Sequence, residues 1–212
     1  MLGGEGAAEL EYLNVCIANY VFDPAIASPE ELLDRYHALT GWASAMRDGG
    51  ARVTVVQHFR LDASLDRSGV DYLFVRDSSP LRGKPLHVVP RMNRSIVALR
   101  PDIVHVNGMR LAIPGARLRR RLPDAALIVQ DHAGRPPNNA LYRTLNRRGL
   151  ACMNAVTFPD AEQAEPWLRA GVLPRRVPVH AVMPCSSEMA LRLRSEARKQ
   201  TGMAGRPLCL WV

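Results

Sequence analysis

Lysine and long apolar runs are both scarce in this sequence. Lys84 and Lys199 are its only two lysines, so arginine supplies nearly all the positive charge behind a formal net charge of +8. No apolar run approaches the roughly 18 residues that suggest a membrane-spanning helix. The first residues, MLGGEGAAELEYL, are acidic where a signal peptide has positive charge. We therefore expect a cytoplasmic protein.

Paired metal-binding and disulfide patterns are also missing. The four cysteines, Cys16, Cys152, Cys185 and Cys209, are scattered and form no CxxC motif. This spacing favours neither a zinc site nor a disulfide framework. Histidines at metal-binding spacing are absent as well. We expect no metal and no cofactor.

Several common catalytic signatures do not occur. No G-x-G-x-x-G follows the first predicted strand, which argues against an ordinary dinucleotide fingerprint. There is no P-loop and no G-x-S-x-G nucleophile elbow. The loop after the first strand reads ANYVFDP, which is not a loop that cradles a pyrophosphate.

The densest positive run is Arg117, Arg119, Arg120 and Arg121, at the end of a predicted helix. Cations near a helix C-terminus commonly face water. The alternative is an anionic partner, either a phosphorylated acceptor or an acidic membrane surface that gives peripheral membrane contact. A nucleic-acid arm usually has a compact basic run with interleaved aromatics, so we expect no nucleic-acid partner.

Strand and helix patterns alternate along the chain. Residues 12–19 read as a short buried strand, and Ser28-Pro29-Glu30-Glu31 is a helix start with a capping box. Leu32, Tyr36, Leu39, Ala43 and Met46 give one continuous helix an apolar face, which Gly49-Gly50 ends. A β-branched strand follows at 51–59, so the first unit is a right-handed βαβ crossover.

The alternation continues to the end of the sequence. Further strands are predicted at 70–76, 102–106, 125–130, 155–158 and 177–182, with helices within 87–99 and at 111–122, 139–148, 161–170 and 188–200. This pattern predicts an α/β fold, a Rossmann-like, doubly wound, mostly parallel sheet. The final LCLWV reads as a buried strand without a partner segment. We expect residues 1–206 to form one domain and 207–212 to open a second; the alternative is a simple edge strand.

The carboxyl ends of the strands are where parallel sheets bind ligands. Asn107 and Gly108 follow one strand, and Asp131, His132 and Arg135 follow the next. Glycine permits close approach of the backbone to a ligand, and an imidazole can hydrogen bond sugar hydroxyls or stabilise developing charge. For His132 a structural role and a functional one are equally favoured.

The chain resembles the N-terminal domain of glycosyltransferase family 4, the retaining sugar transferases of GT-B architecture. The resemblance is carried by LRPDIVHVNG (99–108), LIVQDHAG (127–134), VTFPDAEQAEPW (156–167) and the ending TGMAGRPLCLWV. It implies one domain of a two-domain enzyme, in which this domain binds the acceptor and the other binds most of the nucleotide-sugar donor. It also implies metal-independent chemistry.

The resemblance assigns roles to individual residues. His132 matches a histidine that lines the donor-sugar pocket and is the candidate catalytic residue, while Asn107 and Gly108 match a loop that faces the acceptor. Asp131, Arg135 and Tyr20 are further candidate substrate-binding residues, although the loop at 19–23 lacks the paired glycines of many members.

The predicted function is therefore transfer of a sugar from a nucleotide-sugar donor to a sugar or other hydroxylated acceptor, with negligible activity of this chain alone. Two alternatives remain: a non-catalytic module that binds phosphorylated small molecules, and half of a nucleotide-sugar epimerase.

Overall fold

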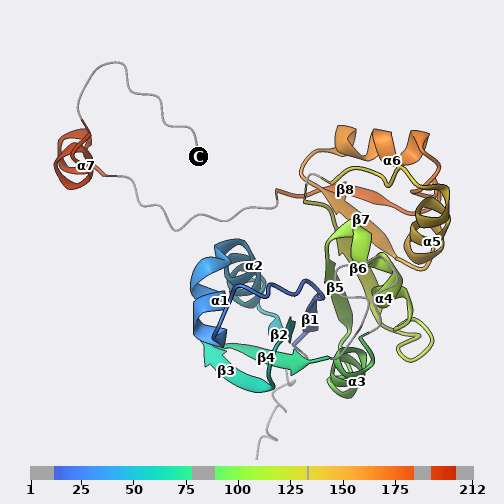
Figure 1. The fold of residues 1–212 in the computed structure, drawn as a ribbon, viewed down its shortest axis with the longest axis horizontal. Helices are drawn as coiled ribbons and strands as arrows, with labels where there is room; N and C mark the ends of the chain where they lie inside the picture. The colour runs from blue at the N-terminus through green and yellow to red at the C-terminus, as the bar shows by residue number, and fades with distance from the viewer. Residues whose placement is uncertain (1–11, 78–88, 133, 184–191, 204–212) are drawn as a thin grey trace, which may run out of the picture.

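The computed structural model describes residues 12–77, 89–132, 134–183 and 192–203, which are arranged around one eight-stranded sheet (Figure 1). The strand order is β3-β4-β2-β1-β5-β6-β7-β8. Only β3 runs antiparallel to its neighbour β4, and the other neighbouring pairs in this part of the chain are parallel. The predicted Rossmann-like, mostly parallel α/β fold is therefore confirmed.

Strands and helices alternate along most of the chain, in the order β1 (Asn14–Asn19), α1 (Pro29–Arg35), α2 (His37–Asp48), β2 (Arg52–Phe59), β3 (Ala63–Arg67), β4 (Val70–Arg76), α3 (Pro90–Ala98), β5 (Ile103–Asn107), the 3-10 helix η1 (Met109–Leu111), α4 (Ala112–Ala116), β6 (Ala126–Gln130), α5 (Ala140–Leu150), β7 (Ala155–Phe158), the 3-10 helix η2 (Ala161–Ala164), α6 (Glu165–Arg169), β8 (Val179–Ala181) and α7 (Arg194–Thr201). No residue of α7 is buried.

Strand β1 marks the point where the strand order reverses. It pairs with β2 on one side, where Ile17 lies opposite Val55, and with β5 on the other, where Ile17 lies opposite His105. The chain builds outward from β1 in both directions, so a crevice forms between the carboxyl ends of β1 and β5. This crevice positions the candidate site.

Helices cover both faces of the sheet because alternate strand residues point to opposite sides. Ile17 packs in a core with Leu32, Leu39 and Ala43 from α1 and α2. Its neighbour Cys16 packs in a second core with residues of α3, α4 and α5. Figure 1 shows α1 and α2 beside the β3-β4-β2 half of the sheet and α5 and α6 beside the β7-β8 half. The domain is doubly wound, as predicted.

The first predicted helix is two helices, so the expectation of one continuous helix was wrong. Ser28 caps α1 as expected, because its hydroxyl accepts a hydrogen bond from the Glu31 amide at 3.1 Å. The Glu31 carboxylate accepts from the Ala27 amide at 2.8 Å, one residue earlier than a standard capping box. Tyr36 then leaves the helical region at φ −97° and ψ 65°, and α2 begins at the next residue. Its hydroxyl donates to Asp23 at 2.8 Å, which anchors the break.

Two further elements differ from the sequence-based prediction. The predicted helix at 111–122 is shorter, since α4 ends at Ala116 and the following residues form turns. The strand β3 was missed; it forms a hairpin with β4 through Ser68 and Gly69, both with positive φ. The predicted LCLWV strand, the first residues of the predicted helix at 188–200, and the proposed boundary at 207 lie outside the described residues.

Candidate functional site

The loop after β1 forms one wall of the crevice. The Asn19 side chain donates to the side-chain oxygen of Gln57 at 2.7 Å, and the side-chain nitrogen of Gln57 donates to the Val21 backbone oxygen at 2.8 Å. Gln57 is itself buried at the end of β2. These bonds fix Tyr20, Val21 and Phe22 at the carboxyl edge of the sheet.

The loop after β5 turns sharply at Gly108, which has φ +107°. An L side chain rarely adopts this conformation, so glycine is required by the backbone. The Gly108 amide donates to the Gln130 backbone oxygen at 3.1 Å, and its carbonyl accepts from the Leu111 amide at 2.9 Å. The turn carries Met109, Arg110 and Leu111 of η1 into the crevice.

The loop after β6 is held by Asp131. Its backbone amide donates to the Thr157 oxygen at 2.8 Å, and its carboxylate accepts from the Gly134 amide at 3.0 Å. The residue is 1% exposed. Asp131 therefore lies at the predicted place, and its carboxylate holds the loop that presents His132.

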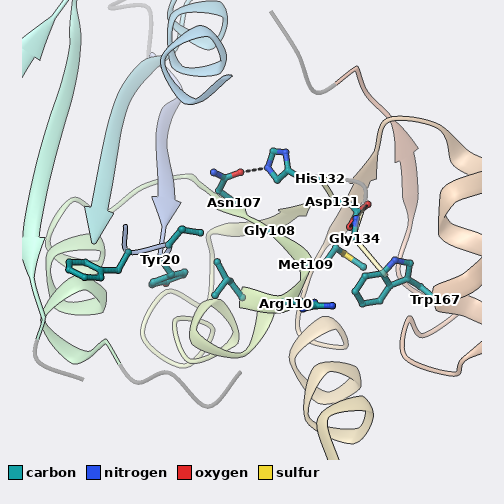
Figure 2. Close-up of a pocket in the computed structure, with 12 residues that line it drawn as sticks. Tyr20, Asn107, Gly108, Met109, Arg110, Asp131, His132, Gly134 and Trp167 are labelled. Atoms are coloured by element: carbon teal, nitrogen blue, oxygen red, sulfur yellow. Dashed lines mark hydrogen bonds between the residues drawn. The ribbon is translucent and has the colours of Figure 1, made fainter. Parts of the chain in front are cut away.

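His132 and Asn107 meet at the ends of neighbouring strands β6 and β5. The His132 Nε2 atom hydrogen bonds the Asn107 side-chain oxygen (Figure 2). An amide oxygen accepts hydrogen bonds, so Nε2 is the donor and the Nδ1 atom of the neutral ring is left as an acceptor. The ring keeps contact with solvent, yet the surrounding crevice removes part of its hydration and lowers its pKa below the usual 6.5. His132 is thus neutral at pH 7.

These three loops enclose a cavity of about 420 Å³. Figure 2 shows Tyr20 on one side and Trp167 on the other, with Asn107 and His132 along one edge. The residues that line it are Tyr20, Val21, Phe22, Asn107, Gly108, Met109, Arg110, Leu111, Asp131, His132, Gly134 and Trp167. The volume lies within the usual range of small-molecule sites.

The cavity brings together five of the six predicted site residues: Tyr20, Asn107, Gly108, Asp131 and His132. Arg135 is exposed in the loop beyond Gly134 and is not among the described lining residues. Tyr20 contributes its ring and not its hydroxyl, which donates to Asn93 at 2.8 Å. Burial raises the pKa of this phenol well above its usual value, so the hydroxyl stays protonated.

Trp167 and the η1 residues were not predicted as site residues. Trp167 comes from α6, which follows β7, and it is fully buried against the loop at Gly134. The segment VTFPDAEQAEPW contributes to the family resemblance and contains this tryptophan. Met109 and Leu111 follow Asn107-Gly108 directly, so the strand-end rule that found Asn107 could also have found them.

A second cavity, of about 250 Å³, lies on the other side of the Asn107–His132 pair. It shares Val21, Asn107 and His132 with the first cavity and is also lined by Asn19, Asp23, Tyr36 and Gln57, among others. The crevice therefore has two lobes that meet at the hydrogen-bonded pair. The His132 imidazole lines both lobes.

A third, small space next to the pair is lined in part by His105 and Gln130. Neither ring nitrogen of His105 and neither amide atom of Gln130 has a hydrogen-bond partner among the described residues. His105 stacks on Trp42 with ring centroids 5.3 Å apart. Burial, with a smaller contribution from His132, lowers the pKa of His105 to about 4. His105 is therefore neutral and buried inside β5.

None of the four arginines of the predicted run lines either lobe of the crevice. Arg119 is partly buried and donates to the backbone oxygens of Pro123 and Ala125, at 3.1 and 2.9 Å, just before β6 begins. It therefore ties loops together at the opposite end of that strand. Arg117, Arg120 and Arg121 are exposed. Binding of an anionic partner by these exposed residues stays a prediction.

Metal-ligand clusters and membrane-spanning helices are both absent from the described part of the chain. It contains no group of three or more His, Cys, Asp or Glu side chains arranged to hold a metal ion. Over the same residues, no helix combines the length and apolar character needed to span a membrane.

The fold and the crevice define a Rossmann-like α/β domain with a candidate ligand site at its topological switch point. Residues 37–184 match the family model of the glycosyl transferase 4-like domain. The chain belongs to this family.

Solved structures of very different sequence share the fold. HepE from Anabaena, in complex with UDP and glucose, is 13% identical with a TM-score of 0.54, covering 90% of this chain and 50% of that one. OtsA in its apo form is 12% identical with a TM-score of 0.53, covering 74% and 42%. UDP-GlcNAc 2-epimerase from Methanocaldococcus jannaschii is 13% identical with a TM-score of 0.50, covering 79% and 45%. At these identities the likeness shows the fold alone.

One similarity is to a protein of a different class. A stretch of 129 residues is 28% identical to DNA polymerase IV of Stenotrophomonas maltophilia, and it covers 60% of this chain and 32% of that protein. The match is weak and partial. The chain thus spans about a third of the length of the curated relatives it matches, and half or less of HepE, OtsA and the epimerase.

Proposed function

We propose that this chain is the acceptor-binding domain of a retaining glycosyltransferase that takes its sugar from a nucleotide-sugar donor. The observation that carries the proposal is the cavity at the carboxyl ends of β1, β5 and β6, with His132 and Asn107 at its edge. Family membership supports it. HepE, which shares the fold, was solved with UDP and glucose.

His132 is the residue proposed to contact the reacting sugar. With Nε2–H directed to Asn107, the Nδ1 atom of the neutral ring accepts a hydrogen bond from a sugar hydroxyl. Such a bond orients the sugar while the bond between its anomeric carbon and the diphosphate breaks. The acceptor oxygen bonds to that carbon, and its proton passes to the departing diphosphate. Correct orientation of reactants is a major source of rate enhancement.

The leaving diphosphate requires donors that lie outside this cavity. Cations and N–H groups stabilise the negative charge that develops on such a group. Among the described lining residues, Arg110 is the one side chain with a permanent positive charge. We therefore propose that the diphosphate is bound mainly by other parts of the enzyme, that no metal is needed, and that this chain alone transfers sugar negligibly.

Substitution of His132 tests the proposed site in the enzyme that carries this domain. His132→Ala should lower sugar transfer from a UDP-, GDP- or ADP-sugar at least about 100-fold, within the usual range for removal of a positioned acid–base or hydrogen-bonding group. His180→Ala is the matched control, because His180 is exposed in β8 and outside the cavity. Equal activity of the two variants would remove His132 from the mechanism.

Titration of this chain with sugars and with UDP tests whether it binds the acceptor while other parts of the enzyme bind the diphosphate. Acceptor-type sugars should shift the amide signals of Asn107 and Met109, and UDP should bind weakly. Tight binding of UDP-sugars by this chain, or robust transfer by it, would contradict the proposal and favour the binding module.

An epimerase half is the second candidate, because UDP-GlcNAc 2-epimerase shares the fold. Epimerisation of UDP-GlcNAc without any transfer to an acceptor would identify that activity.

A further inference from the structure

The cavity between Tyr20 and Trp167 has mostly apolar walls. The side chains that form them are Tyr20, Val21, Phe22, Met109, Leu111 and Trp167. Three different elements contribute these residues: the loop after β1, the 3-10 helix η1 and the helix α6. The apolar surface is therefore continuous in space although it is dispersed along the sequence.

Most polar groups near these walls already have partners within the protein. The Tyr20 hydroxyl donates to Asn93 at 2.8 Å, and the Asp131 carboxylate accepts from the Gly134 amide at 3.0 Å. The Gly108 amide and carbonyl are both used in backbone hydrogen bonds. The polar groups left for a ligand are the Asn107–His132 pair and the exposed Arg110 at the edge, and the buried Trp167 Nε1, which has no partner among the described residues.

This arrangement suits a ligand with two chemically different parts. A sugar ring placed wholly in the cavity would bury several hydroxyl groups, and the Trp167 indole N–H could pair with only one of them. Each buried polar group without a partner weakens binding. An apolar group in the same place would release water from both surfaces and strengthen binding. A hydroxyl at the edge would still reach His132.

We propose that the acceptor is an amphiphile, a hydroxylated compound whose apolar group fills the Tyr20–Trp167 cavity while its hydroxyl lies beside His132. That the ligand is the acceptor of a sugar rests on the proposed function, whereas the apolar binding site does not depend on it. The rim supports the inference, because Val21 is 47% exposed although it is aliphatic and faces the cavity. An apolar group of the ligand that buries this side chain would strengthen binding, and a purely polar ligand has no such group.

Binding to the 212-residue chain tests the proposal by calorimetry and by amide NMR. The probes are phenyl β-glucoside, hexyl β-glucoside and glucose, which share a sugar and differ in the apolar group. At least one glucoside should bind ten or more times tighter than glucose and shift the amides of Met109 and Leu111. The phenyl and hexyl probes separate a planar group from an alkyl chain. Equal affinities for all three would overturn the proposal.

Val21→Gln keeps the chain folded, because the residue is already largely exposed, and it replaces an apolar wall with a polar one. Its affinity for the tighter glucoside should fall about five- to tenfold, as expected for the loss of one aliphatic contact. Leu141→Gln is the matched control: Leu141 is 61% exposed and outside the cavity. The same affinity in both variants would place the ligand elsewhere.

These results separate the two proposals. If the enzyme transfers sugar and this chain binds the glucosides no better than glucose, the proposed function stands and the amphiphilic acceptor is wrong. If the chain binds a glucoside at this wall and the enzyme transfers no sugar, the apolar site stands and the proposed function is wrong.

Discussion

The side-chain oxygen of Asn107 accepts a hydrogen bond from Nε2 of His132 and so joins the carboxyl ends of β5 and β6. The pair lies where the two lobes of the crevice meet. Because the bond fixes which nitrogen carries the hydrogen, Asn107 determines which nitrogen of His132 is left to accept a hydrogen bond from a ligand.

Removal of this partner should change the tautomer of His132. In the wild-type chain at pH 8 we expect mainly the Nε2–H form, and in Asn107→Leu a several-fold rise in the Nδ1–H form, since one hydrogen bond contributes about 1 kcal/mol. Nitrogen chemical shifts of the imidazole report the two forms. Asn138→Leu is the control, because Asn138 is exposed in the loop before α5. A wild-type tautomer in Asn107→Leu would contradict the assigned geometry.

His105 should make the stability of the domain depend on pH. Its pKa is about 4 in the folded chain because burial disfavours the charged ring, whereas the usual value is 6.5. Between these values the unfolded chain binds more protons, so this contribution is complete above pH 6.5 and is lost as pH falls toward 4. The loss amounts to at most about 3 kcal/mol.

Chemical denaturation at several pH values measures this effect. Other groups titrate in the same window, so the informative quantity is the difference between variants. His105→Gln should lose part of the acid sensitivity, and His37→Gln should keep it, because His37 is exposed at the start of α2. Identical pH profiles of wild type and His105→Gln would show that His105 is not the responsible group.

The secondary structure that is encoded locally was predicted well. The β-branched strand at 51–59 and the Ser28 cap depend on neighbouring residues alone, and both are present. The break at Tyr36 depends on a hydrogen bond to Asp23, which helical periodicity does not reveal. The hairpin at Ser68-Gly69 had a readable signal, two turn residues between strand-like segments.

The residues of the candidate site likewise divide into those that the sequence predicts and those that only the tertiary fold reveals. Asn107, Gly108 and His132 follow directly from the rule that ligands bind at the carboxyl ends of parallel strands. Trp167 reaches the cavity only because α6 folds back against the loop after β6, which is a tertiary contact without a local signal. The strand-end rule also placed Asp131 correctly, and it gave no indication that the carboxylate would bond the Gly134 amide.

The contact between α4 and α5 should be intolerant of any side chain at Gly149. A Cβ atom there would lie 3.0 Å from the backbone of Ala112 and Ile113, which belongs to the helix that follows the site loop. Gly149→Ala should therefore destabilise the chain by about 1–3 kcal/mol, as overpacking does, despite the better helix propensity of alanine. Urea denaturation measures the change.

Thr144→Ala in the same helix is the control for that substitution, because Thr144 is exposed. Its stability should change by about 0.5 kcal/mol or less. Equal stability of Gly149→Ala and Thr144→Ala would contradict the expected overpacking between α4 and α5.

Gly108 should link backbone conformation to ligand binding. It has φ +107° between β5 and η1, and Gly50 has φ +91° at the turn before β2, at the other end of the sheet. Gly108→Ala and Gly50→Ala should each cost about 1–3 kcal/mol of stability, because an L side chain is strained at positive φ.

The two variants should differ in ligand binding. Strain at Gly108 should be relieved by a shift of the Met109–Leu111 segment, whereas strain at Gly50 should leave the cavity intact. Only Gly108→Ala should weaken the binding of the tighter glucoside, measured by calorimetry below the unfolding temperature of both variants. Equal weakening in both would show that binding follows global stability and does not depend on the turn at Gly108.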